Sequence, residues 1–253
     1  MTPIVLALAG MVGGDPAPGE RERIVAGARE VVAAIRQAGE DNRRRTARRT
    51  GDALTEHYVR TAARAAGRLP AETAGRAFLL GLGVGLDPSD LMRRNLLVGR
   101  TWRQVESDSE RRARLAVLGG PSIHGRVDLA QHFAVSAALT ALLGEAAAES
   151  AGVMKELLDA RDGGSGFSFA DLAADLSGIA LARRVLKDTT ALGVLERGFR
   201  VTDYCLSPRG LPEGLTTAEF ERRYGGVKDD RYRAMRNDLV DRIAALPGYR
   251  RAR

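Results

Sequence analysis

Apolar residues recur every three or four positions along almost the whole chain, and this spacing is the strongest restriction on its fold. Ile24, Ala28, Val31 and Ile35 follow it near the N-terminus, and the stretch 127–143 follows it in the middle. Such spacing places apolar side chains on one face of an α-helix. No convincing alternation with a period of two indicates β-strands. The sequence therefore predicts an all-α protein, an irregular bundle of many helices.

Helix starts are marked by capping boxes, in which Ser or Thr is followed three residues later by Glu. Ser107 with Glu110 and Thr216 with Glu219 fit this pattern, because the side-chain oxygens can accept hydrogen bonds from free N–H groups at a helix start. We predict three regions. They are an apolar tail over 1–20, a helical bundle domain over 21–200, and a C-terminal linker with helices packing on the bundle over 201–253.

Glycine-rich stretches raise the question of a phosphate-binding loop. The clearest one, GLGVGLD over 81–87, lacks a preceding strand and the glycine spacing of a dinucleotide-binding fingerprint. We interpret it as a place where helices pack closely.

The net charge of +7 suggests nucleic-acid binding at first, because phosphate backbones attract clustered cations. Only three of the 39 basic residues are lysines, however, and the arginines alternate with acids along the chain. Aromatic residues make up 5%, which leaves few surfaces for base stacking. Nucleic acid is therefore not an expected partner, and the arginines over 43–49 leave it only as a distant alternative.

The N-terminal stretch 2–19 contains an apolar run about as long as a signal-peptide core, but no positive residues precede it. A signal would place the protein in the periplasm or envelope, and without one we expect it in the cytoplasm. No other stretch reaches the ~20 uncharged apolar residues that span a bilayer. The single cysteine, Cys205, excludes an internal disulfide and a multi-cysteine zinc site.

The stretch KELLDARDGGSGFSFADLAAD, residues 155–175, gathers five acids around a glycine-rich turn between two predicted helices. Helical spacing puts three small or acidic residues of each helix on one stripe. A short connection makes the helices antiparallel neighbours. This acidic antiparallel hairpin would bring three pairs together: Asp159 with Asp171, Glu156 with Asp175, and Gly152 with Gly178.

Local structure explains part of this cluster. Ser168 followed by Asp171 is a capping pattern, so we interpret Asp171 as the start of a helix. Glu156 and Asp175 have no such explanation, because they lie in the middle of helices. Clustered carboxylates repel one another when buried. They need a metal ion, a shared proton, or a nearby Lys or Arg.

His132 lies on the helix before the hairpin, on the stripe with Ser136 and Leu139 that should turn inward. With Glu156 and Asp175 it would form a His/carboxylate site in the bundle core, and these three are our candidate catalytic residues. The same three, with Asp159, are the candidate ligands of a divalent metal ion. Mixed nitrogen and oxygen ligands suit several ions, so the identity of the metal stays open.

A histidine followed by K-E-x-x-D and S-x-x-D-L-x-x-D-x-x-G resembles a bacterial family of periplasmic lipoproteins of unknown function, and more loosely the VanZ-like envelope proteins. The similarity covers about residues 128–182. The resemblance implies an envelope or membrane-surface setting and supplies no activity. The matched positions are His132, Lys155, Glu156, Asp159, Ser168, Asp171, Asp175 and Gly178. No lipid-accepting cysteine stands near the N-terminus.

Two functions are open from the sequence. The first is a hydrolase or transferase in which Glu156 or Asp175 binds a metal or acts as general base, and His132 is a ligand or proton shuttle. The second is a non-catalytic helical envelope protein in which the polar stripe is an ion-paired packing device.

Overall fold

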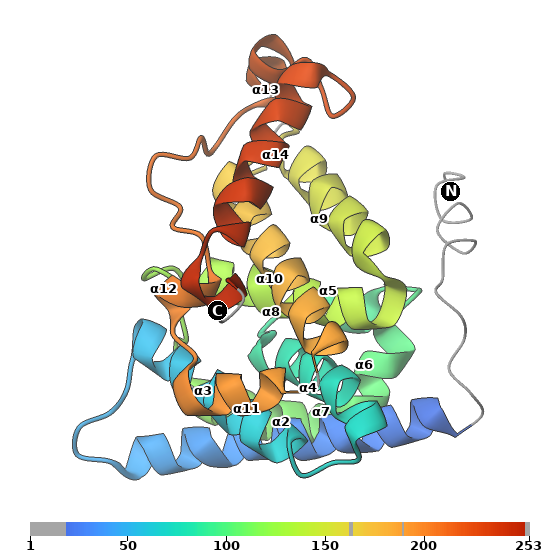
Figure 1. Ribbon diagram of the computed structural model, residues 1–253, viewed down its shortest axis with the longest axis vertical. Helices are drawn as coiled ribbons and strands as arrows, with labels where there is room; N and C mark the ends of the chain where they lie inside the picture. The colour runs from blue at the N-terminus through green and yellow to red at the C-terminus, as the bar shows by residue number, and fades with distance from the viewer. Residues whose placement is uncertain (1–18, 162–163, 189, 251–253) are drawn as a thin grey trace.

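The computed structural model describes residues 19–161, 164–188 and 190–250 (Figure 1). Thirteen α-helices and one short 3-10 helix form the regular structure of these residues, and β-type pairing among them is limited to three isolated bridges. The predicted all-α, multi-helix fold is thus confirmed for this part of the chain. The tail predicted over 1–20 lies almost wholly outside the described residues.

The longest helix, α2, runs along one edge of the molecule (Figure 1). None of the described helices is both long enough and apolar enough to cross a membrane. In chain order the helices are α2 (Glu20–Arg44), α3 (Gly51–Ala66), α4 (Ala71–Leu86), α5 (Leu91–Arg94), α6 (Gly99–Val105), α7 (Asp108–Leu118), α8 (Val127–Leu143), α9 (Glu145–Asp159), α10 (Phe169–Lys187), α11 (Ala191–Gly198), α12 (Val201–Tyr204), α13 (Thr217–Tyr224), α14 (Asp230–Ala244) and the 3-10 helix η1 (Pro247–Tyr249).

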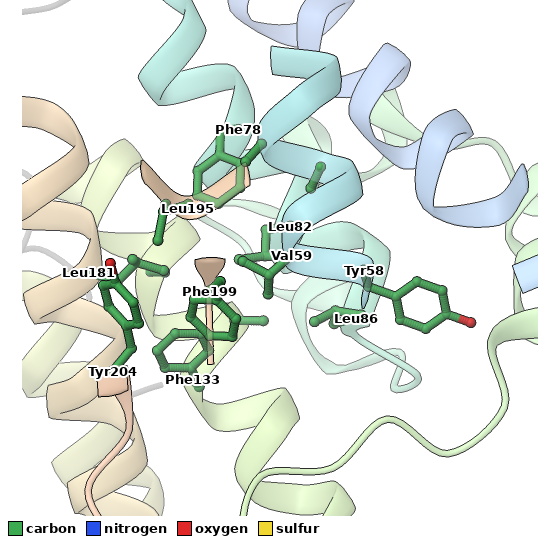
Figure 2. Close-up of a cluster of buried hydrophobic side chains, with 14 of the residues drawn as sticks. Tyr58, Val59, Phe78, Leu82, Leu86, Phe133, Leu181, Leu195, Phe199 and Tyr204 are labelled. Atoms are coloured by element: carbon green, nitrogen blue, oxygen red, sulfur yellow. The ribbon is translucent and has the colours of Figure 1, made fainter. Parts of the chain in front are cut away.

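Helix α4 is the centre of the bundle. Every residue from Ala77 to Leu86 is buried, because α2 covers one side of this helix and α8 the other. A helix that is apolar all round belongs in a core. Figure 2 shows one of the two apolar clusters, in which the rings of Phe133 and Phe199 lie against each other.

Glycines let the central helices approach closely. A Cβ at Gly81 would lie 2.5 Å from the Cβ of Val31 on α2, and a Cβ at Gly83 would lie 2.4 Å from the Cβ of Ala138 on α8. Both distances are shorter than any real contact between carbon atoms. The glycine-rich stretch over 81–87 is therefore a helix-packing surface, as the sequence predicted.

A buried ion pair joins the middle of α7 to the C-terminal ends of α4 and α6. Arg114 of α7 donates to both carboxylate oxygens of Glu106 at 2.7 and 3.0 Å, and to the carbonyl oxygens of Gly85 and Asp87 at the end of α4. Both charged side chains are almost fully buried. Because the carbonyls at a helix end lack partners within the helix, the guanidinium closes the C-terminus of α4.

The C-terminal helices cover the start of α10. Phe167 exchanges two backbone hydrogen bonds with Leu215, and its ring stacks on that of Phe220 with centroids 4.2 Å apart. The Tyr249 hydroxyl donates to the carbonyl oxygens of Ser177 and Tyr204. The described part of 201–253 thus packs on the bundle, although the boundaries at residues 20 and 200 stay a prediction.

We expect Gly83→Ala to lower the free energy of unfolding by about 1–3 kcal/mol, because the added methyl group overpacks the contact between α4 and α8. Gly198→Ala is the matched control, since a Cβ there meets no atom within 4 Å. The control should leave the stability unchanged or raise it slightly. Urea denaturation of both variants measures the difference, and equal stabilities would contradict the packing argument.

Candidate functional site

Three consecutive helices, α8, α9 and α10, bring the candidate site together. Helices α8 and α10 approach closely at Gly178, where a Cβ would lie 2.1 Å from the carbonyl oxygen of Phe133. His132, the residue before Phe133, therefore reaches the acidic face of α10. The site lies where this face meets the end of α9.

The His132 ring lies between two aspartates that are one turn apart on α10. Its Nδ1 is 3.1 Å from Oδ1 of Asp175, and its Nε2 is 3.4 Å from Oδ2 of Asp171. The side chains of His132 and Asp175 are 9% and 4% exposed, so water screens their charges weakly. The two ring nitrogens thus face different carboxylates.

Asp175 is held from two further sides. Ser136 of α8 donates to its Oδ1 at 2.6 Å, and Gly152 of α9 leaves room for its Oδ2, which would lie 2.5 Å from a Cβ at that position. Oδ2 is buried and has no hydrogen-bond partner among the described residues. Because the Ser136 hydroxyl bonds to the aspartate and not to His132, the order of hydrogen bonds differs from that of a Ser–His–Asp triad.

Glu156 is fully buried at the end of α9. Its Oε2 accepts a hydrogen bond from the backbone N–H of Ser168 at 2.9 Å, and its Oε1 accepts one from the ammonium of Lys155 at 3.0 Å. The Ser168 hydroxyl in turn accepts from the N–H of Asp171. Glu156 thus supplies the acceptor that the third residue of a capping box normally supplies.

The Asp171 side chain is consequently turned away from its own helix start. Oδ1 accepts from Arg126 at 3.0 Å, and Oδ2 faces His132 and lies 4.0 Å from the Lys155 ammonium. The capping role of Ser168 is confirmed. Asp171 lies in the first turn of α10, as predicted, and its carboxylate in addition faces His132, a contact that was not predicted from the sequence.

Lys155, Arg126 and Asp159 form the rim of the site. Asp159 accepts from the Lys155 ammonium at 2.7 Å, and its side chain is one-third exposed. Arg126, just before α8, also pairs with Asp128 and Glu213. Lys155 and Arg126 are therefore the partly exposed cations of the site, and its inner part is nearly buried.

His132, Glu156 and Asp171 each offer one ligand atom, and these atoms lie within 4.8 Å of one another. The structure therefore contains a His/Glu/Asp cluster that could hold a metal ion. Of the four ligands predicted from the sequence, His132 and Glu156 are in this set. Asp175 lies behind the histidine ring, and Asp159 lies at the rim.

The predicted register of the hairpin is wrong by about one turn. Glu156 faces Asp171 instead of Asp175, Gly152 faces Asp175, and Gly178 packs on α8. The cause is the connection between Ala160 and Ser168, which is non-helical where it is described and pairs with Leu215. The first turn of α10 lies beside the last turn of α9, where the Ser168 N–H reaches Glu156.

The pKa values of the two central groups, His132 and Glu156, are both raised, but for different physical reasons. Burial alone would lower the pKa of His132, but the charges of Asp175 and Asp171 and the hydrogen bond to Asp175 outweigh it and raise the pKa to about 9. Burial raises the pKa of Glu156 to about 7, although Lys155 opposes this effect. In the metal-free protein the histidine is therefore held as a cation near neutral pH.

Sequence reasoning assigned Asp171 to the helix start and did not single out Arg126. The signal for Asp171 was its position one turn before Asp175 on the same stripe. Arg126 stands in the loop before α8, where no periodicity indicates the direction of a side chain. Comparison of the chain with family models, curated proteins and solved structures gives no match. The function of the site must therefore follow from its geometry.

The metal-free protein should lose stability as pH rises from 5 to 9. Glu156 takes up its proton more tightly in the folded state, so its contribution is complete below its unfolded pKa of 4.5 and is lost as pH rises through about 7. The raised pKa of His132 stabilises the folded state fully below pH 6.5, the ordinary pKa of histidine. This stabilisation is lost as the pH rises through about 9. Each group should contribute on the order of 1 kcal/mol or more.

Urea denaturation in chelator at several pH values measures this dependence. Glu156→Gln cannot titrate, so its stability should vary less than that of the wild type between pH 5 and 7. A stability that is constant or increases between pH 5 and 9 would contradict the assignment.

Proposed function

We propose that the cluster is a divalent metal centre with His132 Nε2, Glu156 and Asp171 as its ligands. The observation that carries this proposal is the convergence of the three ligand atoms within 4.8 Å, beside a histidine whose Nδ1 is held by Asp175. A ligating histidine commonly donates its other N–H to a carboxylate, which fixes the ring and its tautomer. In this protein Asp175 is the carboxylate beside Nδ1 of His132.

The charges of the side chains around the cluster also fit the proposal. Lys155 lies 3.0 Å from Glu156 and 4.0 Å from Asp171, so its ammonium compensates the carboxylates that an ion would bind. The Lys155 side chain is 37% exposed and flexible, and it can turn toward solvent when a cation binds. The proton on His132 Nε2 would leave at the same step.

We propose hydrolysis or group transfer as the chemistry of the centre. Three protein ligands leave at least one coordination position for water or substrate, as in catalytic zinc sites. A bound divalent ion lowers the pKa of water and polarises carbonyl or phosphoryl oxygens. The partly exposed cations Lys155 and Arg126 would attract a substrate with negative charge.

A structural ion-pair network is the second candidate, and one observation favours it. The carboxylates of Glu156, Asp171 and Asp175 already face three cations, namely Lys155, Arg126 and protonated His132. Such a network needs no metal ion. It would fix the packing of α8, α9 and α10.

We further propose that the protein works in the bacterial envelope. The support is the resemblance over about residues 128–182, whose matched residues lie on or beside the α8–α10 site. Detection of the full-length protein in periplasmic and membrane fractions, with a cytoplasmic marker as control, tests this setting.

Elemental analysis after purification, and titration with Zn²⁺ and Mn²⁺, test the metal centre. His132→Ala and Asp171→Asn should each weaken binding at least ten-fold, because each removes one ligand. Asp159→Asn is the matched control, since it removes a rim carboxylate outside the ligand set. Equal weakening by the control would indicate nonspecific attraction to acidic groups.

Asp175→Asn separates the two candidates. In a metal centre it should lower metal affinity about 10- to 100-fold through the orientation of His132, and chelator should lower the melting temperature of the wild type. In an ion-pair network it should cost a few kcal/mol of stability, because it leaves a buried cation uncompensated. A wild type that binds no metal and melts identically with chelator would reject the metal centre.

A further inference from the structure

A cavity lies at the start of α9 and the end of α10, at the opposite end of these helices from the proposed metal centre, where the ends of several helices meet. Its volume is about 560 Å³. It lies beside the N-terminal end of α2, α6 and the start of α9, which Figure 1 shows on one side of the bundle. None of the residues of the proposed metal centre lines it. This cavity is therefore independent of the function proposed above.

The walls of the cavity are apolar. Ile24 and Leu80 line its inner part and are buried, whereas Leu97 and Leu186 at the mouth are each 43% exposed. Large apolar side chains left partly in water are a feature of ligand-binding grooves. The lining thus favours a hydrocarbon group.

The charged residues of the cavity are mostly cations. Arg21, Arg76, Arg183 and Lys187 line it, with Glu145 as the only carboxylate among its lining residues. Arg183 pairs with Glu145, and Arg76 pairs with Glu20 outside the lining.

Two of the cations, Arg21 and Lys187, form no ion pair with a carboxylate of the described residues. Arg21 bonds only to the neutral hydroxyl of Thr101 among the described residues. Lys187 forms no ion pair among the described residues; its charge acts at longer range on Glu145, whose ion pair is with Arg183. The four cations outnumber the two carboxylates that pair with them, Glu20 and Glu145, so the cavity has an excess of positive charge beside its apolar side chains.

We propose that this cavity binds a single-chain amphiphile with an anionic head group, such as an alkyl carboxylate or alkyl phosphate. The chain lies along Ile24, Leu80 and Leu97, and the head group is neutralised by Lys187 and Arg21. Small-molecule pockets have volumes of roughly 300–1,000 Å³ and combine apolar walls with a few charged groups. The observed cavity has both properties.

Isothermal titration calorimetry with decyl phosphate, below the concentration at which it forms micelles, tests the proposal on the full chain. Inorganic phosphate and decanol separate the head group from the chain, and decyl phosphate should bind at least ten-fold more tightly than either. Phosphatidylglycerol vesicles test the alternative that the site recognises only a membrane. Vesicle binding without decyl phosphate binding would overturn the proposal.

Two variants locate the ligand. Lys187→Glu removes a head-group contact and Ala141→Leu fills part of the cavity, and each should weaken decyl phosphate binding at least ten-fold. Lys228→Glu makes the same charge change on an exposed turn outside the cavity, between α13 and α14, and should bind like the wild type. Thermal melts check that each variant is folded. Unchanged affinity in either cavity variant, with the fold intact, would overturn the proposal.

Discussion

A single hydrogen bond, from the backbone N–H of Ser168 to the carboxylate of Glu156, joins the end of α9 to the start of α10. It satisfies one of the free N–H groups that every helix start presents. It also fixes a fully buried carboxylate where it faces Asp171. Because Glu156 takes this acceptor role, Asp171 can turn to His132 and Arg126, so the geometry of the whole site depends on this bond.

The site is also an example of how a buried cluster of acids can be tolerated. Like charges repel strongly in a medium of low dielectric constant, and each buried ion loses its hydration. Here His132, Lys155 and Arg126 approach the carboxylates from three directions. Arg114 and Glu106 solve the same problem differently, with several hydrogen bonds shared between one cation, one carboxylate and two helix-end carbonyls.

Local sequence patterns predicted the helices well. The helical spacing over 127–143 became helix α8, Val127–Leu143, and both predicted capping boxes stand at helix starts, because helical spacing and caps act within a few residues. The participation of His132 and Glu156 was likewise predicted from inward-facing stripes. The register of α9 against α10 was not, since it depends on the pairing of Phe167 with Leu215, which is far away in the chain.

Neither the position of Arg126 nor the buried ion pair of Arg114 could be predicted from the sequence. An arginine that ends a loop and one that lies in an amphipathic helix look like the many arginines on the surface. Only tertiary packing decides which guanidinium is buried and which is in solvent. Because most basic residues of the chain are arginines, the sequence does not indicate that these two lie at the polar interior.

The order of the helices has a consequence for folding kinetics. His132, Glu156, Asp171 and Asp175 come from three consecutive helices, so the loops that must close to bring them together are short. Short loops carry a small entropic cost, and contacts that are local in sequence form quickly. The contacts among α8, α9 and α10 can thus begin to form soon after synthesis of α10, and the pairing of Phe167 with Leu215 fixes their register when the C-terminal segment arrives.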